Sequence, residues 1–220
     1  MITVIDYGAG NLGSVVKALR FVGCTAAVEK DPGKLSAADA AVLPGVGAFG
    51  EAMESLKNSG FVNPILDFIA SGKPFLGICL GLQLLFESSE EAPGVPGLGV
   101  LKGKILRIPA APGLKIPHVG WNTLSVRDRN GLFRDIIGQP YVYFVHSYYL
   151  RAEDRSIVSA TAEYGVTIDA AVRRNNLEAV QFHPEKSGRT GLKMLRNFAD
   201  SVQRDGRERN NVCQTNHPVP

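Results

Sequence analysis

The first ninety residues alternate short apolar runs with segments of helical periodicity, and no other feature of the chain constrains its fold as strongly. Strand-like runs lie at 2–7, 25–29, 39–44 and 74–79. Helix-like segments separate or follow them at 12–22, 53–56, 61–71 and 80–88. Strands joined through helices pair in parallel, with helices on both faces of the sheet. We therefore predict an α/β fold with three layers around a mostly parallel sheet.

The second half of the chain predicts strands with few helices between them. β-rich segments lie at 104–108, 119–126, 141–150, 156–163 and 166–173, which favours antiparallel pairing and hence a mixed sheet. An apolar strand at 177–183 and a closing helix at 189–203 complete a domain over residues 1–203. The polar residues 204–220 predict a disordered tail.

Composition and charge exclude several classes of function. The chain has 220 residues and a net charge of +3, and its charges are scattered, so we expect no nucleic-acid partner. No apolar run approaches the roughly 18 residues of a membrane span, and the N-terminus lacks the pattern of a signal peptide. Three cysteines are too few and uneven for a disulfide framework. We expect a cytoplasmic protein.

One motif after the first strand permits an alternative. Gly8, Gly10 and Gly13 read as G-x-G-x-x-G, and Glu29 and Asp31 follow roughly twenty residues later. This spacing is typical of dinucleotide-binding oxidoreductases.

A sharper motif is G-x-C-x-G at 77–81, between a predicted strand and a predicted helix. A tight strand-to-helix turn exposes a nucleophile, here Cys79, and aims the N–H of Leu80 at a substrate carbonyl. The start of a helix also favours a thiolate over a thiol. The alternative is a buried structural cysteine.

A nucleophilic cysteine needs a base and a group that orients the base. His183 ends an apolar strand, and Glu185 stands two residues later, on the same side of an extended chain held by Pro184. The predicted strand ends of Cys79 and His183 share one sheet edge. The remaining histidines, in a predicted tail, a loop and an aromatic strand, are expected to be structural or surface groups: His217, His118 and His146.

Acyl transfer also needs a second donor for the oxyanion. Gly45 and Gly47, in the sequence LPGVGAFG after the third strand, allow the backbone to turn and expose N–H groups. An ordinary glycine loop before a helix is the alternative.

Three motifs in this order, P-G-x-G at 44–47, G-x-C-x-G-x-Q at 77–83 and H-P-E at 183–185, resemble the class I glutamine amidotransferases. DYGAGNLGSV, PHVGWN, FVHSYY and FHPEKSG resemble one branch of that family, the glutaminase subunits of imidazole glycerol phosphate synthases in histidine biosynthesis. The resemblance covers residues 1 to about 203 and implies a flavodoxin-like α/β fold.

The resemblance implies hydrolysis of L-glutamine to glutamate and ammonia through a thioester on Cys79. His183 would act as the base and Glu185 would orient it. Leu80 and the segment Gly45–Val46–Gly47 would bind the oxyanion. The resemblance implies four residues that hold the glutamine, and no metal or cofactor: Gly47, Gln83, Ser147 and Tyr148.

The resemblance also implies a heterodimer with a (β/α)₈-barrel cyclase, which receives the ammonia directly and without which the glutaminase is nearly inactive. Asn11, Trp121, Tyr143 and Lys186 are the interface candidates. A core aromatic is the alternative for Trp121, and a binding subunit with a vestigial triad is the alternative for the whole chain.

Overall fold

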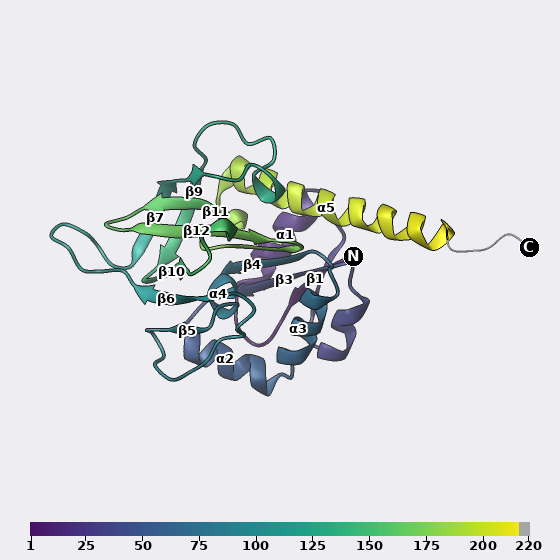
Figure 1. Cartoon of the computed structure of the whole chain (residues 1–220), viewed down its shortest axis with the longest axis horizontal. Helices are drawn as coiled ribbons and strands as arrows, with labels where there is room; N and C mark the ends of the chain where they lie inside the picture. The colour runs from purple at the N-terminus through teal and green to yellow at the C-terminus, as the bar shows by residue number, and fades with distance from the viewer. Residues whose placement is uncertain (216–220) are drawn as a thin grey trace, which may run out of the picture.

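An eight-stranded mixed sheet lies between two layers of helices in the computed structural model, which describes residues 1–215 and side chains up to residue 202 (Figure 1). The parallel strands, in spatial order, are β2 (Ala26–Glu29), β1 (Ile2–Ile5), β3 (Ala40–Gly45), β4 (Phe75–Cys79) and β13 (Leu177–Val180). The antiparallel strands β12 (Thr167–Arg174), β11 (Val158–Glu163) and β8 (Ser125–Val126) continue the sheet. The predicted three-layer, mixed α/β fold is confirmed.

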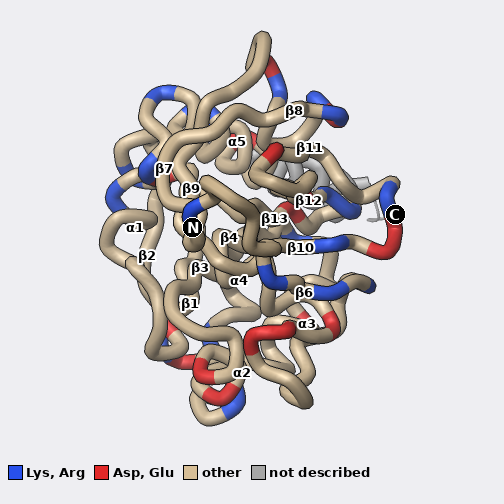
Figure 2. Tube along the Cα trace, turned by 90° about the vertical axis from the view of Figure 1, so that its left-hand side faces the viewer, with Lys and Arg blue, Asp and Glu red and all other residues tan. Residues whose placement is uncertain are grey.

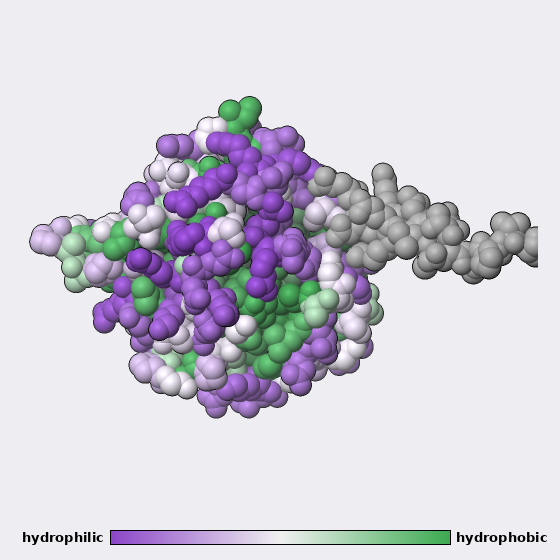
Figure 3. Space-filling view, viewed as in Figure 1, coloured by the Kyte–Doolittle hydropathy of each residue, from purple (hydrophilic) through white to green (hydrophobic). Residues whose placement is uncertain are grey.

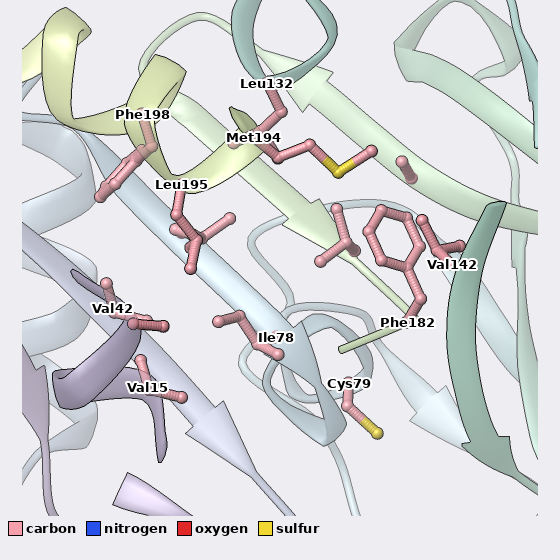
Figure 4. Close-up of a cluster of buried hydrophobic side chains, with 14 of the residues drawn as sticks. Val15, Val42, Ile78, Cys79, Leu132, Val142, Phe182, Met194, Leu195 and Phe198 are labelled. Atoms are coloured by element: carbon pink, nitrogen blue, oxygen red, sulfur yellow. The ribbon is translucent and has the colours of Figure 1, made fainter. Parts of the chain in front are cut away.

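Helices cover both faces of this sheet. Figure 1 shows α1 (Leu12–Phe21) and α5 (Gly188–Thr215) on one side and α2 (Phe49–Asn58) and α3 (Val62–Ala70) on the other. The strands are apolar on both faces, so successive residues enter different cores: Val42 packs in the cluster of α1 and α5, and Leu43 in that of α2 and α3. Figure 4 shows the first of these clusters, which extends to Cys79.

Two small sheets lie beside the central one. The strand β10 (Tyr148–Ala152) pairs with β6 (Gly103–Arg107), which pairs with β5 (Ser88–Ser89). The strand β7 (His118–Thr123) pairs with β9 (Tyr141–His146). The segment 141–150, predicted as one strand, therefore divides at Ser147, and its two halves belong to different sheets.

Short helices complete the chain. The α-helix α4 (Leu80–Leu84) is shorter than predicted, and 3₁₀ helices form at η1 (Pro32–Ala37), η2 (Gly131–Phe133), η3 (Arg155–Ile157) and η4 (Pro184–Lys186). The sequence predicts a disordered tail from Arg204, whereas α5 continues as a helix to Thr215. No proline interrupts this segment before Pro218, and Arg, Glu and Gln favour helix. Residues 216–220 lie outside the described part, and the domain boundary at 203 stays a prediction.

The surface is mixed in charge and polarity. In Figure 2, Lys and Arg occur along β6 and β10, while Asp and Glu gather around α2. Figure 3 shows a mostly hydrophilic face interrupted by a large hydrophobic area near its centre and by smaller ones elsewhere. Among the described residues, no helix is long and apolar enough to cross a membrane.

Candidate active site

Cys79 stands at the end of β4 in a backbone conformation that side chains rarely adopt, with φ 56° and ψ −110°. α4 begins at the next residue. A side chain at Gly81 would overlap the carbonyl group of Leu43, and one at Gly77 would lie 3.0 Å from the carbonyl oxygen of Gly81. The glycines of the motif therefore allow β3, β4 and α4 to meet closely. In Figure 4 the sulfur of Cys79 points away from the cluster of apolar side chains.

His183 and Glu185 form a buried pair. The distance from His183 Nδ1 to Glu185 Oε1 is 2.8 Å, and both side chains are at most 3% exposed. The extended link predicted between them is wrong, because β13 ends at Val180 and Pro184 opens the 3₁₀ helix η4. His183, which precedes the proline, is extended, and Pro184 favours the first position of a helix. The hydrogen bond between His183 and Glu185 therefore spans this turn.

The surroundings of His183 favour its protonated form. Burial opposes a charge on the ring, but Cys79 and Glu185 outweigh it and raise the pKa of His183 to about 9. Nε2 of the ring is buried and has no hydrogen-bond partner among the described side chains and backbone. The arrangement can thus hold a protonated imidazole beside Cys79, as suits the activation of a cysteine nucleophile by a base.

A cavity of about 320 Å³ opens in front of Cys79, within the size range of small-molecule sites. Eight of the residues predicted for catalysis or binding line it: Val46, Gly47, Cys79, Leu80, Gln83, Ser147, Tyr148 and His183. Gly45 lies behind the lining, since a side chain there would approach Leu80 and the hydroxyl of Tyr7. Glu185 lies behind His183. One end of the sheet therefore gathers residues that are distant in the sequence.

Three further polar residues at this site were not predicted. Glu91 lines the cavity, and its Oε2 accepts a hydrogen bond from the backbone N–H of Phe49 at 2.8 Å. The hydroxyl of Tyr7 is buried without a hydrogen-bond partner among the described residues. Gln181 is fully buried and lies against the sulfur of Cys79. Gln181 had a sequence signal, because it precedes His183 by two residues, and Tyr7 belongs to the motif DYGAGNLGSV.

His146 lines the cavity, whereas it was expected to be a structural or surface group, and His118 begins a strand and does not lie in a loop. The two rings bond to each other at 3.0 Å, and His146 Nδ1 donates to the carbonyl of Tyr148 at 2.9 Å. Burial lowers the pKa of His118 to about 4 and that of His146 to about 3. Both imidazoles therefore stay neutral near pH 7. His217 lies outside the described residues.

The strand pair β7–β9 presents an exposed apolar face next to the site. We call this face the aromatic patch, and it consists of Val119, Trp121, Tyr141, Tyr143 and Val145. Trp121 is 46% exposed and stacks on Tyr141 with 5.6 Å between ring centroids. Lys186 Nζ lies 5.9 Å from the ring centre of Tyr143. Three of the four interface candidates are thus neighbours.

Asn11, the fourth candidate, is exposed just before α1. α1 itself contacts η4. Asn11 lies within the glycine motif, whose Gly8 and Gly10 have positive φ angles and form the turn from β1 into α1, while Gly13 belongs to α1.

The carboxylates of the two acidic residues in the dinucleotide motif accept hydrogen bonds from backbone N–H groups nearby in the sequence. Glu29 accepts the N–H groups of Lys30 and Asp31, and Asp31 accepts that of Gly33. Among the described residues, both carboxylates are therefore engaged within their own turns. Among the described residues no cluster of three or more His, Cys, Asp or Glu side chains could hold a metal ion.

Comparison with known proteins identifies what the chain resembles as a whole. The family model described as "Glutamine amidotransferase class-I" matches residues 3–202. The chain is 51% identical to imidazole glycerol phosphate synthase subunit HisH of Syntrophotalea carbinolica, over 91% of this chain and all of the relative. It is 52% identical to the HisH subunit of Thermosynechococcus vestitus, over 92% of this chain and 97% of the relative.

Solved structures share the fold. A glutamine amidotransferase matches with a TM-score of 0.72 at 20% identity, covering 92% of this chain and 98% of the other. A chain of PurLQS from Thermotoga maritima matches with a TM-score of 0.69 at 20% identity, covering 91% of this chain and 98% of the other.

Proposed function

The chain belongs to the class I glutamine amidotransferases, and we propose that it is the glutaminase subunit of an imidazole glycerol phosphate synthase in histidine biosynthesis. It hydrolyses L-glutamine to glutamate and ammonia. The observation that carries this proposal is the buried arrangement of Cys79, His183 and Glu185 beside the cavity. The assignment to histidine biosynthesis depends on the relatives, which share about half of its residues.

The reaction begins with the attack of Cys79 on the side-chain amide carbon of glutamine. His183 takes the thiol proton and delivers it to the departing nitrogen, so that ammonia leaves and a glutamyl thioester remains. Water then attacks the thioester, with His183 again as the base, and glutamate and the free thiol are formed. Glu185 keeps the ring oriented and stabilises its cation.

Backbone N–H groups stabilise the tetrahedral intermediates. We assign one donor to Leu80, the first residue of α4, and the other to the segment Gly45–Val46–Gly47. One such donor contributes about 10²–10³ in rate. The backbone of Gly47, with φ +98°, is in a conformation suited to glycine, so the segment can present its N–H groups to the cavity.

The cavity also offers groups for the two ends of the amino acid. Gln83 uses its amide N–H groups on Tyr148 O and Gln181 Oε1, which leaves Oε1 of Gln83 to accept from a substrate. The carboxylate of Glu91 has the charge to bind the α-ammonium group. Ser147 and Tyr148 complete the set assigned to the glutamine.

The ammonia passes to a partner. At neutral pH free ammonia is mostly ammonium, which is not nucleophilic, so a cyclase that adopts a (β/α)₈ barrel receives it directly and forms the heterodimer. Its docking face is the aromatic patch with Asn11 and Lys186. Exposed aromatic groups of this kind are typical of interface centres. We place the reaction in the cytoplasm, where the thiols of Cys24 and Cys79 stay reduced.

Replacement of the nucleophile tests this function. We expect Cys79→Ala to abolish glutamine-dependent synthesis of imidazole glycerol phosphate in the complex, while added ammonium salt still supports it. Cys24→Ala, which changes the half-buried free thiol, serves as the matched control and should retain both activities. Glutamine-dependent turnover in Cys79→Ala would contradict the assignment.

A binding subunit with a vestigial triad is separated by a second measurement. A glutamine-analogue alkylator should label Cys79 when the partner is present and stop glutamine-dependent synthesis. The absence of both effects would support the vestigial alternative.

A further inference from the structure

We propose that Gln181 is a catalytic residue of this site, whose side-chain amide donates a hydrogen bond to the sulfur of Cys79 and stabilises its thiolate. This inference builds on the proposed function. It assigns the residue that holds the charged sulfur on the side away from the cavity. No proton is transferred by the amide; the thiol proton still goes to His183.

The sheet itself places Gln181 beside the nucleophile. In the parallel pair of β13 and β4, Val180 lies opposite Ile78, so the next residues along the two strands, Gln181 and Cys79, face each other. Gln181 is completely buried, and its Nε2 lies 3.8 Å from Cys79 Sγ. Its backbone N–H bonds to the carbonyl of Ala170 at 2.8 Å, which fixes the residue to β12.

A chain of hydrogen bonds determines which end of the amide faces the sulfur. The carbonyl oxygen of Tyr148 can only accept, so Gln83 must turn its NH₂ group toward it, at 3.1 Å. The same NH₂ group donates to Oε1 of Gln181 at 3.0 Å. Gln181 therefore has its oxygen on Gln83 and its NH₂ group on Cys79.

The carbonyl group of Tyr148, where this series of hydrogen bonds starts, is also held in place. The Tyr148 carbonyl accepts a second bond from His146 Nδ1, and His146 bonds in turn to His118. Since both imidazoles stay neutral, the direction of every bond along this row is constant near pH 7. A donor with a fixed direction in a buried site stabilises an anion more than a solvated one does.

The geometry also explains why an amide is suited to this place. A buried thiolate with no donor on its inner side would depend on His183 alone, and His183 must give up its proton during each cycle. Hydrogen bonds to charged groups contribute more than neutral ones. The amide keeps the sulfur anionic and aimed at the cavity while the imidazole changes its protonation state.

The rate of alkylation of Cys79 by iodoacetamide, measured against pH, tests the proposal on the full-length chain. Peptide mass spectrometry reads Cys79 separately from the other thiols. Gln181→Leu keeps a similar volume and removes the donor. We expect the midpoint of its pH–rate profile to rise by about one unit. An unchanged midpoint would overturn the proposal.

A second variant decides the question if Gln181→Leu does not fold. Gln181→Glu keeps the acceptor for Gln83 but places an oxygen beside the sulfur, so its midpoint should rise further than that of Gln181→Leu. A midpoint equal to that of the unchanged protein would refute the donor role. Asn197→Leu is the matched control, because it removes a buried amide that bonds the carbonyls of Leu132 and Arg134. Its alkylation profile should not move.

The two proposals fail in different ways. If Cys79→Ala retains glutamine-dependent turnover, the proposed function is wrong. If Cys79→Ala is inactive but the Gln181 variants alkylate with the original profile, only the role of Gln181 is wrong. Co-purification of the Gln181 variants with the cyclase in a one-to-one complex, as for the unchanged protein, shows that they fold and dock.

Discussion

A hydrogen bond of 2.8 Å joins Nδ1 of His183 to Oε1 of Glu185, and only Pro184 lies between the two residues in the sequence. The other oxygen of Glu185 is buried and has no hydrogen-bond partner among the described residues. Among the described residues, His183 is therefore the only hydrogen-bond partner of the Glu185 carboxylate.

Glu185→Gln should reduce glutamine-dependent kcat by about 10²–10⁴-fold, because an amide of the same shape cannot stabilise the imidazolium and can hold the wrong tautomer. Steady-state rates with glutamine and with ammonium salt measure the effect. The ammonium-dependent rate should stay unchanged. A glutamine-dependent rate within threefold of the original would show that Glu185 does not orient the base.

Stability should fall as pH rises from about 6.5 to about 9 because of His183. The folded state raises its pKa to about 9, so over this range the folded chain binds more protons than the unfolded chain. The stabilisation is complete below pH 6.5 and is lost as pH passes 9. Urea unfolding at several pH values measures the slope, which cannot exceed about 1.4 kcal/mol per pH unit for one proton. His183→Gln should flatten it.

Glu178→Gln should stabilise the protein at pH 8. Burial raises the pKa of Glu178 to about 7, so the carboxyl binds a proton on folding between about pH 4.5 and 7, and above pH 7 the fold contains a buried charge. Glutamine keeps an acceptor for the N–H of Leu132, which Glu178 binds at 2.8 Å. We expect a gain of about 1–3 kcal/mol at pH 8 and little change at pH 4.5. Equal gains at both pH values would contradict this account.

Trp121→Ala should weaken binding of the cyclase subunit by about 30-fold or more, since exposed tryptophans at interface centres often contribute about 2 kcal/mol. Titration calorimetry measures the Kd. Phe21→Ala is the matched control: Phe21 is 77% exposed at the end of α1. It should bind normally. Equal loss in both variants would place the docking face elsewhere.

Gly81→Ala should cost about 3 kcal/mol or more, or prevent folding, because the added methyl group would overlap the carbonyl of Leu43. Gly13→Ala is the control, since nothing lies near the site of its methyl group and alanine favours the helix α1. Thermal unfolding of both variants measures the difference. Similar melting temperatures would show that the strand-to-helix turn at Gly81 tolerates the contact.

Local patterns predicted most of the architecture and most of the residues that meet at the candidate site, because strand periodicity and the G-x-C-x-G turn are properties of short segments. The division of 141–150 at Ser147 was missed, since both halves are apolar and only their partners differ. Gln181 and Glu91 were missed for a related reason. Their roles depend on Cys79 and Phe49, which are remote in the sequence and become neighbours only through the order of the strands.

The strand β9 has two different faces. Tyr143 and Val145 face outward in the aromatic patch, while Val142 and Phe144 are buried and Tyr143 bonds through its backbone to His183 and Ser187. Before assembly its outer face meets water, and apolar strands of this kind promote aggregation. If this patch is the proposed docking face, the cell gains from making both subunits together in equal amounts, so that each newly folded glutaminase finds its partner before it finds another copy of itself.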